Sequence, residues 1–121
     1  MTAVWVALAG SAGAMARFTL DGAIKHRRAA RFPWATFVIN VTGSLILGIV
    51  TGLVLFHDVT HDLEVILGIG FCGGYTTFST ASFETVRLIQ NQHYYTAAAN
   101  TFGSLLTTIA AGAAGLALTA L

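Results

Sequence analysis

Long apolar stretches separated by short polar links make up almost the whole chain. Apolar residues prevail over about 3–20, 32–56, 63–90 and 94–121, and polar residues gather in the links between these stretches. A helix needs about 20 mainly apolar residues to cross the hydrocarbon core of a bilayer, and each stretch is close to or above that length. The alternation of a membrane β-barrel is absent. The pattern predicts an all-α membrane protein, with four transmembrane helices in one domain covering residues 1–121.

The centre of the third stretch contains residues that disfavour a continuous helix. Gly73 and Gly74 are adjacent, and Thr76 and Thr77 follow with β-branched side chains whose hydroxyls compete for backbone hydrogen bonds. We therefore predict a break in this helix. Inside a bilayer, unpaired backbone groups are tolerated only where protein or a hydrated cavity surrounds them. Freed carbonyls can coordinate a cation, and freed amides can meet an anion, so the break indicates a transport protein.

Composition supports this assignment and excludes other classes. The chain is 55% hydrophobic and only 9% charged, whereas a soluble domain carries about 25% charged residues. The single cysteine, Cys72, excludes an intrachain disulfide framework. No basic segment precedes the first apolar stretch, so a cleaved signal peptide is not expected. The formal charge of +1 indicates no nucleic-acid partner, and we find no credible catalytic set, so an enzyme is not expected.

The basic residues predict an orientation in the membrane. Four crossings place the first and third links on one side, where Lys25, Arg27, Arg28, Arg31 and Arg87 fall. The other side, with both termini, has no lysine or arginine. The positive-inside rule then places the first and third links in the cytoplasm and both termini outside, in a multi-pass protein of the plasma (inner) membrane. So strong a bias predicts that every copy inserts the same way up.

Polar and aromatic residues within the apolar stretches are candidates for an ion path. Asn40 either forms a hydrogen bond between helices or directs an amide N–H at a small anion. Phe78 is either packing filler or an aromatic ring whose positive edge lines an anion path. Several hydroxyls recur at helical spacing, although such groups often bond their own helix: Ser79, Thr80, Ser82, Ser104, Thr107 and Thr108.

Charged residues near the ends of the stretches have more than one interpretation. Arg17 is either an ordinary end residue that extends toward water or a group that draws anions into a vestibule. Glu84 pairs with Arg17 or Arg87, or lies in a wet cavity. His57 and His61, with neighbouring aspartates, have the spacing of a surface metal site, but a solvated polar link explains them more simply.

Three segments, at 10–18, 32–40 and 70–84, together resemble the Fluc (CrcB-type) fluoride channels, and the third carries the most specific motif. The resemblance implies a passive, fluoride-selective channel that exports cytoplasmic fluoride and so relieves its toxicity. It also implies an antiparallel dimer of four-helix subunits with two separate pores. The length and the number of apolar stretches agree with this family over essentially the whole chain.

The resemblance also assigns roles to individual residues. Asn40 would be the pore amide and Phe78 the first phenylalanine of an aromatic box. A structural Na⁺, not transported, would be held by the backbone carbonyls of Gly73 and Thr76 from both subunits. Arg17 would flank the vestibule, and we expect Glu84 to lie there too. The full set expected along the fluoride pore is Asn40, Phe78, Ser79, Thr80, Ser104 and Thr108.

Two positions depart from the family pattern. Ala81 stands where the second box phenylalanine is expected, and Asn100 aligns with a tyrosine of the fourth helix. Because the charge bias also predicts a single orientation, we hypothesise that the chain pairs with a separately encoded, oppositely oriented relative, although an antiparallel pair with itself is the family arrangement. Two other functions stay open. One is a non-conducting accessory subunit, and the other is a small proton-coupled exporter, which would need a carboxylate within the first helix; only Asp21, at its end, is available.

Overall fold

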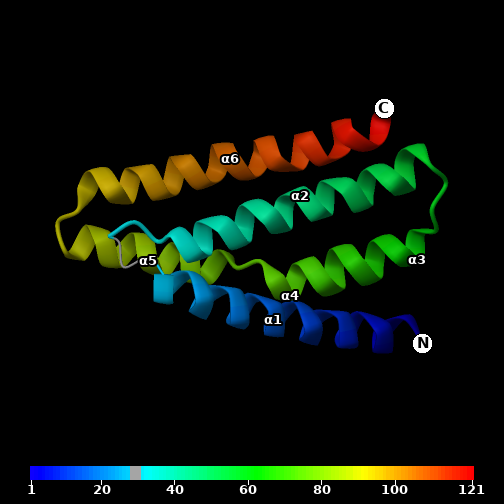
Figure 1. Cartoon of the computed structure of the whole chain (residues 1–121), viewed down its shortest axis with the longest axis horizontal. Coiled ribbons are helices and arrows are strands. Elements are labelled where there is room, and N and C mark those ends of the chain that lie inside the picture. Colours follow the sequence, from blue (N-terminus) through cyan, green and yellow to red (C-terminus); the bar gives the residue numbers. More distant parts are fainter. Residues whose placement is uncertain (28–30) are drawn as a thin grey trace.

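The computed structural model describes residues 1–27 and 31–121, and within them every regular element is helical. Arg28 of the basic link lies outside the described residues. Figure 1 shows long, nearly antiparallel helices lying side by side. In chain order, the elements are α1 (Thr2–Arg27), α2 (Trp34–Phe56), α3 (His61–Glu64), η1 (Val65–Cys72), α4 (Gly73–Tyr75), α5 (Phe78–Gln90) and α6 (Tyr94–Ala120).

Among the described residues, three helices are long and apolar enough to cross a membrane: α1, α2 and α6. The apolar stretch over 63–90 is not a fourth such helix because it is divided. It contains the π-helical segment η1, and residues 76–77 separate α4 from α5. In η1 the Gly73 amide donates to the Gly68 carbonyl five residues earlier, a wider turn that the sequence pattern does not reveal.

The two ends of the bundle differ in charge. Both termini and the connection from α2 to α3 lie at one end in Figure 1. The C-terminal end of α1, the start of α2 and the turn from α5 to α6 lie at the other. The lysine and described arginines of the links, Lys25, Arg27, Arg31 and Arg87, belong to this second end.

Helices α2 and α6 approach closely because glycines remove side chains from their interface. A Cβ added at Gly48 would collide with the backbone of Gly112, and one at Gly52 would collide with the Thr119 side chain. Gly115 faces the backbone of α2 in the same way. Small residues at such positions let helix backbones pack within a membrane, where dispersion contacts replace the hydrophobic effect between helices.

Helix α1 packs on the opposite side of the divided segment by the same means. Gly13 leaves no room for a side chain against the Phe71 carbonyl, and Gly74 leaves none against the Gly10 carbonyl. The small-residue stretch of the first apolar segment is therefore a packing surface. It fixes the position of η1 and α4, and so places the residues that follow them.

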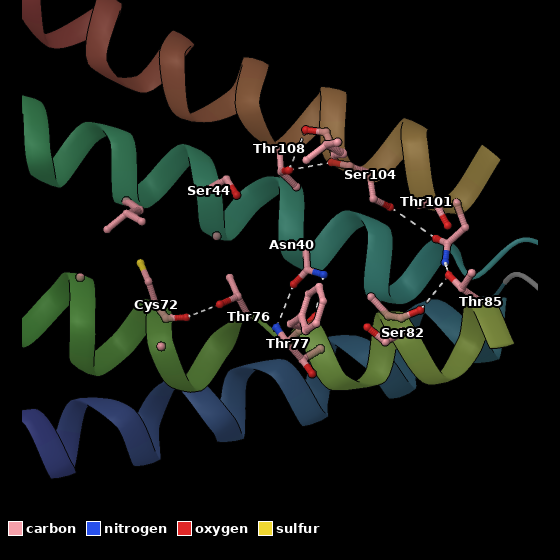
Figure 2. Close-up of a pocket in the computed structure, with 18 of the residues that line it drawn as sticks. Asn40, Ser44, Cys72, Thr76, Thr77, Ser82, Thr85, Thr101, Ser104 and Thr108 are labelled. Carbon is pink, nitrogen blue, oxygen red and sulfur yellow. Dashed lines mark hydrogen bonds between the residues drawn. The ribbon is translucent and has the colours of Figure 1, made fainter. Parts of the chain in front are cut away.

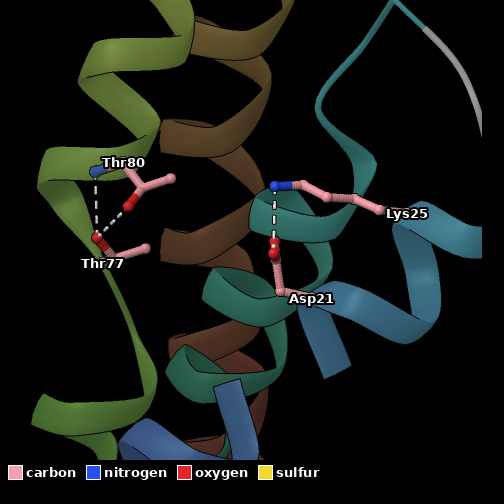
Figure 3. Close-up of polar contacts among 4 residues, drawn as sticks. All are labelled: Asp21, Lys25, Thr77 and Thr80. Carbon is pink, nitrogen blue, oxygen red and sulfur yellow. Dashed lines mark hydrogen bonds and ion pairs between the residues drawn. The ribbon is translucent and has the colours of Figure 1, made fainter. Parts of the chain in front are cut away.

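Helix α1 continues to Arg27, beyond the end expected near Leu20. Its last turns are polar, and Lys25 Nζ lies 3.1 Å from Asp21 Oδ2, one turn earlier (Figure 3). Ion pairs at this spacing support helix in exposed sequence. The apolar pattern marks where the helix leaves the hydrocarbon, not where its hydrogen bonding ends.

Much apolar surface is left exposed by this packing. Met15, Ile69 and Leu106 are each well over half exposed, while few large side chains are fully buried. Soluble monomers rarely expose contiguous apolar surface of this extent. Lipid or another protein chain is therefore needed to cover the bundle.

Candidate functional site

The backbone is extended at Thr76 and Thr77, between α4 and α5. Thr76 has ψ 163°, and Thr77 has φ −150° and ψ 123°. The Thr77 hydroxyl accepts a hydrogen bond from the Thr80 amide at 3.1 Å, which caps the first turn of α5 (Figure 3). Threonine suits this position because its side-chain oxygen replaces a missing helical acceptor. Helix α5 thus starts anew at Phe78.

Asn40 on α2 forms a reciprocal pair of hydrogen bonds with the peptide groups of Thr77. The Thr77 amide donates to Asn40 Oδ1 at 2.9 Å, and Asn40 Nδ2 donates to the Thr77 carbonyl at 2.9 Å (Figure 2). One carboxamide therefore satisfies both backbone groups of an unwound residue. The second Nδ2 hydrogen of Asn40 has no hydrogen-bond acceptor among residues 1–27 and 31–121.

The interruption withdraws helical donors from two carbonyls. In a continuous helix the Gly73 carbonyl would accept from the Thr77 amide, and the Thr76 carbonyl from the Thr80 amide. Here the Thr77 amide donates to Asn40, and the Thr80 amide donates to the Thr77 side chain. The carbonyls of Gly73 and Thr76 are thus released from the helical ladder, and both residues line the same groove.

This groove has a volume of about 810 Å³ and lies between α2, the divided segment and α6. Its walls combine apolar side chains with amides and hydroxyls (Figure 2). Helix α1 contributes no residue to it. Its polar lining side chains are Asn40, Ser44, Thr76, Thr77, Ser82, Thr85, Asn100, Thr101, Ser104 and Thr108.

The groove brings together most of the predicted pore residues. Asn40, Phe78, Ser104 and Thr108 line it, although they come from three helices. Phe78 is 87% exposed in the single chain, so its ring stands in the open mouth of the groove. Gly73 and Thr76, the predicted sodium ligands, lie on the same wall.

Ser79 and Thr80 do not line this groove. Their hydroxyls cluster instead around the Thr77 hydroxyl, at 3.4 Å and 3.1 Å respectively. The reason is the phase of α5, which begins at Phe78: residues 78, 81, 82 and 85 face the groove at helical spacing, whereas 79 and 80 lie outside this set. The hydroxyls on the groove side of α5 are those of Ser82 and Thr85.

Glu84 lies in a second cavity, of about 390 Å³, at the basic end of the bundle. Lys25, Arg31 and Arg87 also line this cavity. The Oε1 atom of Glu84 is buried and has no hydrogen-bond partner among the described residues. Arg17, the other predicted vestibule residue, is half-buried on α1 and lines neither cavity.

Sequence reasoning passed over Thr85 and Thr101 and treated Asn100 only as an alignment position. The signal was available in the spacing, because Asn100, Ser104 and Thr108 follow one another every four residues along one face of α6. Thr85 stands seven residues after Phe78, two turns along α5.

A family model described as CrcB-like protein, Camphor Resistance (CrcB), matches residues 4–116. This chain belongs to the CrcB family. The match confirms the resemblance drawn from the segments at 10–18, 32–40 and 70–84. Together with the three apolar helices, membership establishes the chain as a membrane protein.

Individual relatives match this CrcB-family chain over most of its length. "Fluoride-specific ion channel FluC 1" of Leifsonia xyli is 51% identical over 113 residues, which cover 93% of this chain and 81% of the relative. "Fluoride-specific ion channel FluC 2" of Cutibacterium acnes is 46% identical over 119 residues, covering 98% and 97%. A third relative, "Fluoride-specific ion channel FluC" of Pyrococcus furiosus, is 42% identical over 105 residues, covering 86% of this chain and 84% of the relative.

Proposed function

We propose that the chain is a subunit of a fluoride-selective, passive ion channel that releases cytoplasmic fluoride and so relieves its toxicity. The observation that carries this proposal is Asn40, an amide donor within an apolar helix, which is bonded to the interrupted segment and lines a groove of apolar side chains, amides and hydroxyls. The names of the relatives support fluoride as the ion.

The groove offers an anion hydrogen-bond donors without positive charge. Asn40 keeps one N–H beyond its bond to Thr77, and it replaces water around fluoride without trapping the ion. Phe78 adds a ring edge, which carries partial positive charge on an apolar side chain. Ser104 and Thr108 complete a polar lining along α6. Weak, repeated binding of this kind permits rapid passage.

The divided segment over 61–90 is, in this proposal, the third crossing of the membrane. Its two halves continue along the bundle between the same ends as the long helices (Figure 1). The unwound backbone at Thr77 is hydrogen-bonded to Asn40 of α2, and Thr76 and Thr77 both line the groove. Non-helical residues at membrane depth are tolerated where protein or a hydrated cavity surrounds them in this way. With four crossings, the basic end faces the cytoplasm and both termini lie outside.

Gly73 and Thr76 fit a structural sodium ion. Their carbonyls have lost their helical donors, and carbonyl oxygens released by an interrupted helix are characteristic Na⁺ ligands. Such an ion would hold the interrupted segment against its counterpart in a second subunit. It would not move with fluoride.

The groove is open on one side, and a second four-helix chain is proposed to cover it. Phe78 and Leu105 both line the groove and remain more than half exposed in the single chain. In an oppositely oriented partner, the corresponding carbonyls would lie opposite those of Gly73 and Thr76. The two chains together would then enclose two pores. Because the cationic link residues described lie at one end of the bundle, we favour a partner encoded by a separate, oppositely charged relative over a second copy of this chain.

We propose that the second cavity is the vestibule of the channel. Glu84, with the cations of Lys25, Arg31 and Arg87, forms a charged entrance at the basic end of the bundle. Attraction by these cations would raise the local fluoride concentration at low ionic strength. Arg17 lines neither cavity, so any effect it has on fluoride would act at longer range.

Fluoride efflux from proteoliposomes tests the proposed function. We expect vesicles containing this chain with its partner to release fluoride rapidly when a potassium ionophore balances charge, and to retain chloride. A fluoride electrode follows the release, and empty vesicles are the control. Retention of fluoride by vesicles that contain a correctly assembled complex would instead support the non-conducting accessory subunit, which Ala81 in the groove favours as the second candidate.

Orientation is tested separately with a reporter fused to the C-terminus. We expect only the extracytoplasmic reporter signal, since the described cations of the links lie at the basic end. Replacing Lys25, Arg27 and Arg31 with glutamine weakens the excess of positive charge at this end. The variant is therefore expected to insert in both orientations. Equal signals from the unmodified chain on both sides would contradict a single orientation and favour the homodimer.

A further inference from the structure

A separate, apolar groove lies between α1 and α2 at the basic end of the bundle. This α1–α2 groove has a volume of about 390 Å³, within the range of about 300–1,000 Å³ that is typical of ligand pockets. Its lining consists of apolar side chains and one cation: Leu20, Ala23, Ile24, Arg27, Trp34 and Val38. The four residues from α1 follow one another at helical spacing, so they form one continuous face.

The α1–α2 groove faces away from the groove that Asn40 lines. On α2, Trp34 and Val38 are about one turn apart and share a face. Asn40 stands two residues beyond Val38, on nearly the opposite side of the helix. Helix α1 contributes no residue to the groove of Asn40. A partner chain that covers the groove of Asn40 would therefore leave the α1–α2 groove open to lipid.

Arg27 is the described link cation that lines this groove. Lys25, Arg31 and Arg87 line the second cavity instead, and Arg27 does not. The nearby carboxylate of Asp21 is engaged by Lys25 at 3.1 Å (Figure 3). The Arg27 side chain is exposed and has no ion-pair partner among residues 1–27 and 31–121. It is therefore available to an anion from outside the chain, and a guanidinium suits a phosphate because it donates two parallel N–H bonds.

Trp34 gives the α1–α2 groove a fixed wall near the headgroup boundary of the membrane. Its ring centroid lies 4.7 Å from that of Phe32 and 5.8 Å from that of Phe37. Ile24 and Trp34 also line the second cavity, so they separate the charged cavity from the apolar groove. Tryptophan is enriched at the membrane–water boundary, and Trp34 opens α2 at the end where α1 finishes (Figure 1). The cation and the apolar lining therefore meet where a phospholipid has its phosphate and the start of its acyl chains.

We propose that the α1–α2 groove binds an acyl chain of an anionic phospholipid whose phosphate contacts Arg27. An apolar groove holds water poorly, and a lipid chain that fills it gains the packing contacts that α1 and α2 do not make with each other there. Arg27 favours a headgroup with net negative charge over a zwitterionic one. In the orientation proposed above, the lipid anchors the basic end of the bundle in the anionic cytoplasmic leaflet. This role is separate from the fluoride path.

Quenching of Trp34 fluorescence tests the lipid site directly. Dibrominated acyl chains quench tryptophan at short range, so Trp34 reports a chain in the groove that it lines. The assembled complex, with every other tryptophan including Trp5 replaced by phenylalanine, is reconstituted in phosphatidylcholine vesicles. Dibrominated phosphatidylglycerol or dibrominated phosphatidylcholine then replaces a rising fraction of the lipid in both leaflets. The orientation of the complex in the vesicles therefore does not affect the result.

Two pairs of variants locate the bound lipid. Arg27→Gln removes the cation, and His26→Gln is its control, because His26 is exposed beside Arg27 but lines none of the three cavities described. Ala23→Phe fills the groove, and Gly22→Phe is its control, because a Cβ at Gly22 meets nothing within 4 Å. Arg27→Lys keeps the positive charge. Gel filtration checks the assembly of each variant.

In the unmodified complex, we expect half-maximal quenching at an about fivefold lower fraction of phosphatidylglycerol than of phosphatidylcholine, the scale of one cation beside an anionic lipid. Arg27→Gln and Ala23→Phe should abolish this preference. Arg27→Lys, His26→Gln and Gly22→Phe should keep it within about twofold, since the charge and the groove are both retained.

Several results would overturn the inference. One is equal quenching by the two lipids in the unmodified complex, and another is a preference that persists in Arg27→Gln or in Ala23→Phe. Loss of the preference in His26→Gln or Gly22→Phe would do the same, because neither residue lines the groove. Absence of quenching by either lipid would show that a protein chain covers the groove. Because fluoride efflux is not the readout, failure of the lipid site leaves the proposed channel function standing, and failure of fluoride efflux leaves the lipid site standing.

Discussion

Replacing Asn40 with leucine is expected to reduce fluoride efflux about tenfold or more, because the proposed pore would lose a donor to a charged ion. The variant also leaves the amide and carbonyl of Thr77 unpaired. Each buried backbone group without a partner costs about 1–3 kcal/mol, so thermal stability should fall as well. Efflux from proteoliposomes and a melting curve of the purified complex measure the two effects.

Two further variants check the role of Asn40. Asn40→Asp keeps an oxygen for the Thr77 amide, but it turns its second oxygen toward the Thr77 carbonyl and adds a negative charge beside the path, so we expect efflux to fall at least as far as in Asn40→Leu. Ser44→Ala, one turn along α2 and in the same groove, is the control and should change neither property strongly. Normal efflux from folded Asn40→Leu would refute the assignment of Asn40 as the pore amide.

Replacing Gly48 with valine is expected to prevent correct folding. Any Cβ at this position meets the backbone of Gly112, which cannot rotate away as a side chain would. Overpacking costs about 1–3 kcal/mol where side chains adjust, and a clash with backbone lies at the upper end or above. The helices α2 and α6 must separate, and Gly52 and Gly115 then lose their contacts too. Size-exclusion chromatography of a fluorescent fusion should show aggregate in place of a single peak.

Gly22→Ala is the matched control for this result. Gly22 lies on the exposed face of α1, and a Cβ there meets nothing within 4 Å. Alanine is favoured over glycine in a helix interior by about 1 kcal/mol, so stability should stay the same or rise slightly. A monodisperse, thermally unchanged Gly48→Val complex would show that α2 and α6 do not depend on this close contact.

The sequence predicted the long helices well because their apolar patterns are long and their polar links are short. The region around Thr76 and Thr77 was recognisable as a poor helix from its glycines and β-branched residues. The hydrogen-bond partner of this region, Asn40, could not be predicted, because the bonds between Asn40 and Thr77 depend on how α2 is rotated against the divided segment. Nothing in the residue types indicated the π-helical turn of η1, which shares its composition with ordinary helix.

The residues of the candidate site were likewise predictable only in part from the sequence. Residues of α6 at four-residue spacing could be placed on one face by counting along a regular helix. The position of Ser79 and Thr80 outside the lining of the groove could not be counted from the preceding residues, because the helical phase restarts at Phe78 and the extended residues before it carry no such periodicity. The grouping of Glu84 with Lys25 and Arg31 required the three-dimensional packing of three helices.

The reciprocal pairing of Asn40 with Thr77 makes the unwound segment preorganised. Both peptide groups are satisfied by the protein itself, so the passage keeps its shape between one ion and the next. An arriving ion therefore does not have to reorder the segment, and its passage needs no conformational step of the backbone at Thr77.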